Sequence, residues 1–318
     1  MKKNYLITGG TGFIGSNLVK KLIYLGHKVK VFDNNSRGSL TRLKEVVKDV
    51  EVVFGDIRDQ DFFIKSSKKV DSIIHLAAIN GTKNFYLNPD IVLDVGIKGL
   101  LSVVTAAKKN CISEIFFSSS SEVYQSPNYI PTSENVPLII PDVFNPRYSY
   151  GGSKIISELI LIHGVKKIFK KIIIFRPHNV YGPDMGKEHV IPELIIRANK
   201  IFKEKNIGKK FVIQGNGKET RSFIHISDFI NGLLLIMNKG KNLNIYNIGT
   251  MEEISIKALS KIILKNYNLK NKIKSSNIRL GSTLRRCPDI SKIRQLGFKQ
   301  KILLKEGLKD TIDWYSSI

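Results

Sequence analysis

The sequence has little cysteine and no long apolar stretch. Cys111 and Cys287 are the only cysteines in 318 residues, and neither belongs to a spacing typical of a metal site. We therefore expect two reduced, inert thiols, a cytoplasmic protein and no metal centre. No stretch reaches the roughly 18–20 uninterrupted apolar residues of a membrane span. The N-terminal MKKNYLITGG predicts a strand followed by a turn rather than a signal peptide, so no membrane partner is expected.

The sequence is also poor in acidic residues. It contains 27 Asp and Glu against 51 Lys and Arg, which gives a net charge of +24. This balance raises the possibility of nucleic-acid binding. The lysines, however, are spread from Lys2 to Lys309 without a basic motif interleaved with aromatic residues. Compositional drift explains the charge better, and we expect no nucleic-acid partner, although the positive field would help to attract an anionic substrate.

Apolar runs and helical patterns alternate over the first half of the chain. Between the apolar runs lie helical patterns, for example at residues 13–26 and 91–110. The runs typical of buried strands lie at residues 4–8, 28–33, 50–55, 70–77, 112–118 and 172–176. This alternation predicts an α/β fold with a Rossmann-type, doubly wound parallel sheet. Because ligands of such folds bind at the carboxyl ends of the strands, functional residues are expected just after each apolar run.

After about residue 176 the pattern becomes less regular. Turn signals crowd residues 182–186, 215–217 and 249–250, and helical segments remain near 190–203, 255–266 and 304–316. We expect a dinucleotide-binding domain over residues 1–175. A smaller C-terminal α/β substrate domain is expected over residues 176–318, with some segments returning to the first domain.

The sequence TGGTGFIG at residues 8–15 follows the first strand and opens the first helix. Glycine permits the tight turn and lets the backbone approach a pyrophosphate at the helix N-terminus. Asp33 ends the second strand, where a carboxylate binds the ribose hydroxyls of NAD and repels a 2′-phosphate. Arg37, close by, would favour NADP, but the strand-terminal Asp33 favours NAD. The NAD-binding residues expected here are Gly9, Gly12, Phe13, Ile14, Gly15, Asp33 and Asn34.

Two further strand ends agree with a dinucleotide. Asp56 and Ile57 could hold an adenine by its amino group and its face. Leu76, Ala77 and Ala78 form a turn small enough for the cofactor to lie against the backbone. The neighbouring His75 is expected to pack within its strand rather than to act in catalysis.

The segment PRYSYGGSK at residues 146–154 places Tyr150 four residues before Lys154. In a helix this spacing puts the phenol and the ammonium on one face. A nearby ammonium, together with a positive nicotinamide ring, would lower the pKa of the phenol. The phenolate could then take a proton from a sugar hydroxyl as hydride leaves the same carbon. Tyr148 has the wrong spacing and is expected to pack or to touch substrate.

Together these motifs resemble the extended short-chain dehydrogenase/reductase family, specifically its NAD-dependent nucleotide-sugar epimerases and dehydratases. The resemblance covers nearly the whole chain: the glycine loop, Asp33, DIRD at residues 56–59, HLAA at 75–78, the serine run at 118–121 and YxxxK at 150–154. It implies that Ser120, Tyr150 and Lys154 form the hydride-transfer triad, with Tyr150 and Lys154 also contacting the cofactor. It also implies a homodimer through helices near 90–108 and 150–164. Gly96 departs from the family, whose members often carry asparagine there.

The resemblance also implies residues that bind a nucleotide-diphosphate sugar. Asn179, Arg221 and Arg286 match the positions that hold the diphosphate, and two arginines with an amide form a suitable fork. The helix that begins near Val190 resembles the one that meets the nucleotide base, whose identity the sequence leaves open. Arg285 is expected at the surface. His178, His189 and His225 have no metal-like spacing and are expected to be structural or to lie at the rim.

The reaction depends on the stretch SSEVY at residues 120–124. Oxidation at C4 gives a 4-keto sugar, from which epimerisation, 4,6-dehydration or decarboxylation of a uronic acid can follow, with NAD regenerated in the first two. Ser121 stands where thymidine-type dehydratases carry an acidic Asp, and it is expected to touch substrate. Glu122 is a candidate base for the C5 proton. We therefore expect an epimerase/dehydratase; the alternatives are a nucleotide-uronate decarboxylase, a non-sugar carbonyl reductase or a catalytically silent binding protein.

Overall fold

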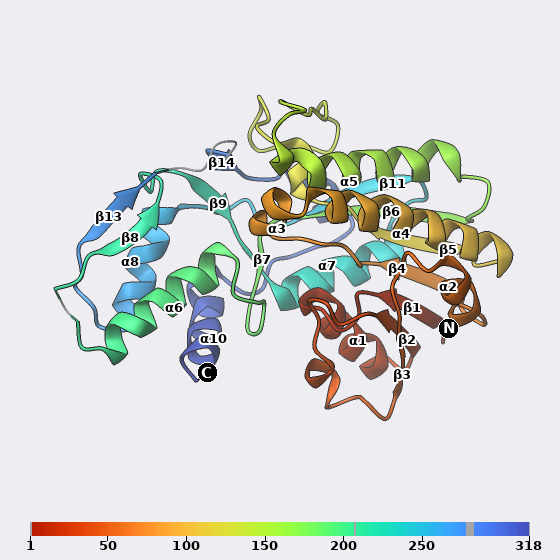
Figure 1. The fold of residues 1–318 in the computed structure, drawn as a ribbon, viewed down its shortest axis with the longest axis horizontal. Helices are drawn as coiled ribbons and strands as arrows, with labels where there is room; N and C mark the ends of the chain where they lie inside the picture. Colours follow the sequence, from red (N-terminus) through yellow and green to blue (C-terminus); the bar gives the residue numbers. More distant parts are fainter. Residues whose placement is uncertain (1, 207, 278–282, 318) are drawn as a thin grey trace. The chain divides into compact units, whose positions relative to one another are not determined.

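The computed structural model describes residues 2–206, 208–277 and 283–317, which fold into two compact units (Figure 1). The first unit comprises Met1–Gln125, Pro137–Pro177 and Ile230–Tyr246. The second unit comprises Ser126–Val136, His178–Phe229 and Asn247–Ile318. The chain therefore passes between the units several times, and the segment Ile230–Tyr246 returns to the first unit after the second has begun.

A seven-stranded sheet organises the first unit, in the order β11-β6-β5-β4-β1-β2-β3. Its strands are β1 (Asn4–Thr8), β2 (Lys28–Asp33), β3 (Val50–Phe54), β4 (Ser72–His75), β5 (Glu114–Ser118), β6 (Lys171–Pro177) and β11 (Asn244–Ile248). Neighbouring strands from β3 to β6 pair in parallel. The six apolar runs of the first half thus form strands, as predicted. The order reverses between β1 and β4, so their carboxyl ends flank the crevice where such folds bind ligands.

Helices cover both faces of this sheet, with α2, α4 and α5 on one face and α1 and α7 on the other (Figure 1). The helices and single turns of this unit are α1 (Phe13–Tyr24), η1 (Leu40–Leu43), α2 (Gln60–Ser66), α3 (Thr82–Leu87), α4 (Pro89–Lys109), η2 (Ser121–Tyr124), η3 (Pro146–Tyr148), α5 (Ser149–Leu159), the π-helical turn η4 (Ile160–Gly164) and α7 (Ile226–Lys239). Leu6, Ile73 and Ile115 have no exposed surface because helices cover both sides of their strands. Strands buried in this way read as continuous apolar runs.

The second unit is built from short strands and three mutually packed helices, α6, α8 and α10. Its elements are β7 (Val180–Tyr181), α6 (Val190–Lys203), β8 (Phe211–Gln214), β9 (Thr220–Ser222), β10 (Ile224–His225), β12 (Glu253–Ser255), α8 (Ile256–Asn266), β13 (Ile273–Ser276), β14 (Arg285–Arg286), α9 (Ser291–Gln295) and α10 (Leu304–Ser316). Strand β9 lies between β12 and β14 in a three-stranded sheet. This small sheet carries two of the residues expected to hold a diphosphate.

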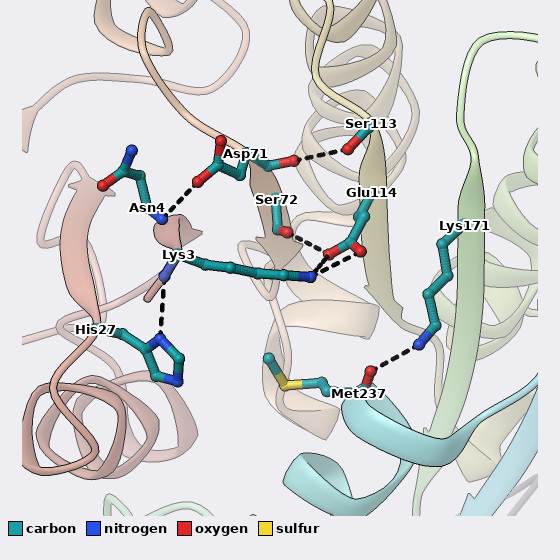
Figure 2. Close-up of polar contacts among 9 residues, drawn as sticks. All are labelled: Lys3, Asn4, His27, Asp71, Ser72, Ser113, Glu114, Lys171 and Met237. Carbon is teal, nitrogen blue, oxygen red and sulfur yellow. Dashed lines mark hydrogen bonds and ion pairs between the residues drawn. The ribbon is translucent and has the colours of Figure 1, made fainter. Parts of the chain in front are cut away.

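Polar contacts tie the strands together at the amino ends of β1, β4 and β5 (Figure 2). The Lys3 ammonium lies 2.7 Å from a carboxylate oxygen of Glu114, and the Ser72 hydroxyl donates to the same carboxylate at 2.5 Å. Lys171 of β6 donates to the carbonyl of Met237 at 2.7 Å. These contacts lie at the edge opposite the carboxyl strand ends, so they stabilise the sheet away from the candidate site.

Across the part of the chain that the structure describes, no helix is long and apolar enough to cross a membrane. The same residues contain no group of three or more His, Cys, Asp or Glu side chains that could hold a metal ion.

Candidate active site

The glycine loop between β1 and α1 is packed too tightly for side chains. Gly9 has a φ of 72°, and a Cβ there would lie 2.9 Å from the backbone nitrogen of Ala77. A Cβ on Gly15 would overlap the carbonyl oxygen of Gly9 and lie 2.7 Å from the Cα of Gly10. Glycine at these positions therefore brings the first turn of α1 and the end of β4 close to the loop, and it leaves backbone N–H groups open to a ligand.

A cavity of about 130 Å³ opens beside this loop. Its lining includes most of the residues expected to bind NAD: Gly9, Gly12, Asp33, Asn34, Asp56, Ile57, Leu76, Ala77 and Ala78. Phe13, Ile14 and Gly15 lie on the first turn of α1 and do not line it. The cavity combines glycine backbone, a strand-terminal carboxylate and small apolar residues, which is the surface that a dinucleotide requires.

The carboxylate of Asp33 is held in place by the backbone. One oxygen accepts the N–H of Thr11 at 2.9 Å and the other accepts the N–H of Asn35 at 2.9 Å. Because each carboxylate oxygen offers about two lone pairs, both can still accept a ribose hydroxyl. Arg37 lines the same cavity.

Asp56 is paired within its own turn. Its carboxylate accepts three hydrogen bonds from Arg58, two of them from the guanidinium at 2.9 and 2.6 Å. The side-chain hydrogen bonds from Arg58 lower the pKa of Asp56. The side chain therefore stays ionised beside the cavity, where it can accept from an adenine amino group.

His75 is a structural residue of β4, as expected. Its side chain is 2% exposed, and its Nδ1 lies 2.7 Å from the hydroxyl of Thr8. Burial, followed by the charge of Lys154, lowers the pKa of His75 to about 3, so the ring is neutral. The Thr8 hydroxyl in turn accepts the N–H groups of Leu76 and Ala77 at 3.2 Å. This arrangement fixes the turn on which the cofactor residues lie.

Tyr150 and Lys154 lie on one face of α5, next to the end of β5. The Lys154 ammonium donates to the carbonyl of Ser118 at 2.8 Å and lies 5.6 Å from the centre of the Tyr150 ring. The side chain of Ser120 lies close enough to the phenol to lower its pKa. Burial lowers the pKa of Lys154 to about 7, although the carboxylate of Glu158 opposes the shift. The structure thus brings together the three residues of the expected triad.

In the protein alone, without the nicotinamide ring on which the expectation also depends, the pKa of the Tyr150 phenol is raised. Burial raises this pKa to about 12, with Ser120 lowering it and Glu122 raising it. The ring stacks on Phe85 at 4.9 Å between centroids, in an apolar cluster that disfavours the phenolate. Forming the phenolate therefore requires positive charge beyond that of Lys154.

Glu122 follows Ser120 on the 3₁₀ turn η2. It lies 3.8 Å from the guanidinium of Arg147, and the two side chains are 19% and 9% exposed. The Ser120 hydroxyl accepts the N–H of Glu122 at 3.1 Å, which caps the turn. A Cβ on Gly151 would lie 2.9 Å from the Glu122 carbonyl. Glycine at this position therefore lets α5 pack directly on the turn that carries Glu122.

Gly96 has a packing explanation. A Cβ there would lie 3.0 Å from the hydroxyl of Ser153 and 3.1 Å from its Cβ. The helices α4 and α5 thus approach each other at Gly96, where an asparagine would displace Ser153.

In the second unit, Arg221 and Arg286 are direct partners in the parallel pairing of β9 with β14. Arg221 donates to the carbonyls of Thr220 and Thr283 at 2.7 and 2.6 Å. Asn179 donates to the carbonyl of Ser222 at 2.8 Å. The three residues expected to hold a diphosphate, far apart in the sequence, therefore lie within one small sheet and its neighbouring loop. Val190 is the first residue of α6 and is exposed.

One buried group near the triad was missed by sequence reasoning. The carboxylate of Glu158 forms a two-point ion pair with Arg176, at 2.9 and 2.6 Å. Two signals were available: Glu158 lies one helical turn after Lys154, and Arg176 ends the apolar run at residues 172–176. Arg285, by contrast, is exposed as expected and pairs with Glu253 at 2.5 Å.

Comparisons with known proteins agree with this site. Residues 5–249 match the model of the NAD dependent epimerase/dehydratase family. The chain belongs to the NAD-dependent epimerase/dehydratase family. The family, the α/β Rossmann-type fold and the NAD cofactor predicted from the sequence are thus confirmed.

Relatives within the NAD-dependent epimerase/dehydratase family catalyse different reactions. The chain is 33% identical over 316 residues to a Methanocaldococcus jannaschii protein assigned as a UDP-glucose 4-epimerase, covering 97% of each. It is 30% identical over 328 residues to the UDP-N-acetyl-alpha-D-glucosaminuronate decarboxylase of Bacillus cytotoxicus, covering 100% of this chain and 99% of the other. A dTDP-glucose 4,6-dehydratase from Streptomyces venezuelae, solved with NAD and TYD, superposes with a TM-score of 0.88 at 26% identity over 99% and 97% of the chains. Similarity alone therefore does not select among the reactions.

Proposed function

We propose that the protein is a nucleotide-sugar epimerase/dehydratase that oxidises C4 of the sugar to a transient ketone and recycles tightly bound NAD. The observation that carries this proposal is the convergence of Ser120, Tyr150 and Lys154 at the end of β5. A reductase of a non-sugar carbonyl would have no use for the Asn179, Arg221 and Arg286 set.

Tyr150 is assigned as the base that takes the proton from the C4 hydroxyl. NAD, when bound, supplies the hydride acceptor and a positive charge that favours the phenolate. Ser120, which lowers the pKa of the phenol, is assigned as its hydroxyl partner. Lys154 is fixed by the Ser118 carbonyl, which keeps its ammonium beside the tyrosine ring. In epimerisation, return of the proton from Tyr150 to the sugar oxygen closes the cycle, whereas dehydration leaves the C4 ketone in the product.

The cofactor fits the residues of the first unit. The Gly9–Gly15 loop offers backbone N–H groups to the pyrophosphate, and Asp33 offers its carboxylate to the ribose hydroxyls. Asp33 is the more decisive residue for the choice between NAD and NADP, because its charge would repel a 2′-phosphate.

Glu122 is assigned as the base for the C5 proton of the keto sugar. Removal of this proton allows the C6 hydroxyl to leave, which is the dehydratase reaction. The nearby guanidinium of Arg147 stabilises the carboxylate form that a base requires. Ser120 and Ser121 are assigned as substrate-binding residues for the same reaction.

On the second unit, Asn179, Arg221 and Arg286 are assigned to the diphosphate of the substrate, and Val190 to the nucleotide base. The cross-strand pairing of the two arginines supports this assignment, because it places two residues of the type that binds a diphosphate side by side on neighbouring strands.

One observation favours a second function, decarboxylation of a nucleotide uronate. Arg147 is 9% exposed, and its Nε has no hydrogen-bond partner. A buried guanidinium with an unused donor suits an anionic substituent on the sugar, such as a carboxylate at C5.

We also propose a cytoplasmic homodimer. Apolar side chains stay exposed on the neighbouring helices α4 and α5: Ile91, Leu93, Leu101, Ile156 and Leu159. A face of this kind supports a helix-to-helix contact with a second copy. Light scattering after size exclusion tests this: the wild type should be a dimer and Leu101→Glu a monomer, whereas a monomeric wild type would contradict it.

The proposed function is tested by incubating the purified protein with UDP-, GDP-, CDP- and dTDP-sugars and following NAD reduction. We expect transient NADH with at least one nucleotide sugar. Protein that binds NAD but neither forms NADH nor converts any of these sugars would be a catalytically silent member of the fold.

A further inference from the structure

A buried ion pair lies directly beneath the triad. Arg176 of β6 is 1% exposed and Glu158 of α5 is 3% exposed. Each carboxylate oxygen of Glu158 receives one guanidinium nitrogen, at 2.9 and 2.6 Å. The Ser119 hydroxyl donates to Glu158 at 2.5 Å, and Arg176 donates to the hydroxyl of Tyr124 at 2.7 Å. The pair is thus satisfied on several sides, as a buried ion pair must be to be tolerated.

Three of the four residues come from the elements that carry the reacting groups, and the fourth, Arg176, comes from β6. Ser119 precedes Ser120 at the end of β5, and Tyr124 ends the turn η2 that carries Glu122. Glu158 lies one turn after Lys154 on α5. A shift of any one of these elements would break at least one bond to the pair. The ion pair therefore couples the positions of the serine, the glutamate and the lysine of the site.

The pair also contributes to the electric field at Lys154. The charged or titratable groups facing Lys154 are Tyr150 and Glu158 on its own helix and His75 on β4, and Arg176 on β6 stands behind Glu158 as its ion-pair partner. His75 is neutral, and the Tyr150 phenol is protonated in the protein alone. Glu158 is the group that favours the ammonium of Lys154, against the cost of its burial. The arginine holds that carboxylate in place and offsets part of its charge.

We propose that Glu158, held by Arg176, is a positioning residue that fixes the reacting elements together and sets the charge of Lys154. This role rests on the proposed function, in which Lys154 assists the tyrosine base.

Substitutions of the two partners are predicted to shift the pKa of Lys154 in opposite directions. Glu158→Gln leaves the positive Arg176 without its counter-charge, so Lys154 should lose its proton about one pH unit lower. Arg176→Met leaves the negative Glu158, so Lys154 should lose its proton about one pH unit higher. A general loosening of the site would not move the two titrations in opposite directions.

The test is an NMR titration of protein labelled with ¹³C at the lysine Cε, which needs no substrate. Most lysines titrate near 10.4, so a resonance that titrates near 7 stands apart, and its loss in Lys154→Met assigns it. The matched control is Glu114→Gln, which removes a carboxylate paired with a lysine at the opposite edge of the sheet. The control should leave the titration of Lys154 unchanged. The electrostatic role would be overturned if the titration of Lys154 stayed unchanged in both variants of the ion pair, or if it moved in the same direction in both.

Removing one partner of a buried pair can prevent folding, so a double variant completes the design. Glu158→Gln with Arg176→Met removes both charges and should return the titration of Lys154 to within about half a unit of the wild type. Substrate-dependent NAD reduction should still fall at least about tenfold, because Ser119 and Tyr124 lose their shared anchor. A folded double variant with the wild-type rate would overturn the positioning role. If Lys154 titrates as predicted in all variants but the protein converts no nucleotide sugar, the result would count against the proposed function alone.

Discussion

The packing of the glycine loop predicts that Gly15→Ala weakens both the fold and NAD binding. The added methyl group would meet backbone atoms only, the Gly9 carbonyl and the Gly10 Cα. Backbone cannot move aside as a flexible side chain can, so the loop must shift. Overpacking of this kind costs roughly 1–3 kcal/mol, and about 0.5–1 kcal/mol is regained because alanine favours the helix.

The net loss is therefore about 0.5–2 kcal/mol, which corresponds to a fall in Tm of roughly 1–3 °C for a protein of this size. The loop would also leave the position that its N–H groups need for a pyrophosphate, so we expect NAD affinity to fall at least about tenfold. Thermal unfolding followed by circular dichroism measures the first effect, and isothermal titration calorimetry with NAD measures the second.

The matched control is Gly164→Ala in the turn η4. A Cβ there would meet only the Cγ2 of Ile160, at an ordinary 3.9 Å. We expect its Tm and NAD affinity to equal or slightly exceed those of the wild type. If Gly15→Ala behaves like this control, the close approach of backbone at Gly15 does not limit cofactor binding.

Three further predictions concern single side chains. Tyr150→Phe should lower substrate-dependent NADH formation about 10²–10⁴-fold with unchanged NAD affinity; a residual rate near that of the wild type would rule out Tyr150 as the base. Asp33→Asn should reduce NAD affinity about tenfold, since its amide nitrogen cannot accept an N–H, and calorimetry that finds full affinity would contradict the ribose assignment. For Glu114, burial raises the pKa, but hydrogen bonds from Lys3 and Ser72 outweigh it and the net shift is downward. The contact therefore stabilises the fold fully above the ordinary pKa of the carboxyl, and this stability is lost as the pH falls through the lowered pKa. Glu114→Gln should reduce the free energy of unfolding in urea by about 1 kcal/mol at pH 7 and leave it unchanged in strong acid. An equal reduction at both pH values would refute this linkage.

Sequence patterns predicted the parts of the fold that repeat a simple period. The apolar runs at β1 to β6 and the helices α1, α4, α6, α8 and α10 were all recognisable from strand or helix periodicity. The strand β11 was not recognised, because the five residues Asn244–Ile248 form neither a continuous apolar run nor a strict alternation. Its place beside β6 depends on a long-range pairing that no local pattern encodes.

For the site, too, local spacing was predictable from the sequence and contacts between distant residues were not. Short-range spacing was sufficient for the Tyr150 and Lys154 pair and for the glycine loop. Spacing could not reveal that burial against Phe85 raises the pKa of Tyr150, because Phe85 is distant in the sequence. The ion pair of Glu158 with Arg176 escaped detection for the same reason, since its two charges come from different elements.

The central claim is that Glu122 acts on the keto sugar that Tyr150 and Lys154 generate. Its most direct test is mass spectrometry of the products from the nucleotide-sugar panel, with wild type and Glu122→Gln compared. We predict loss of one water with the wild type, or loss of carbon dioxide if the substrate is a uronate. With the variant, partial NAD reduction should persist while water loss stops. Full turnover by Glu122→Gln, or a product of unchanged mass that forms equally with both proteins, would contradict the assignment of Glu122 as the C5 base.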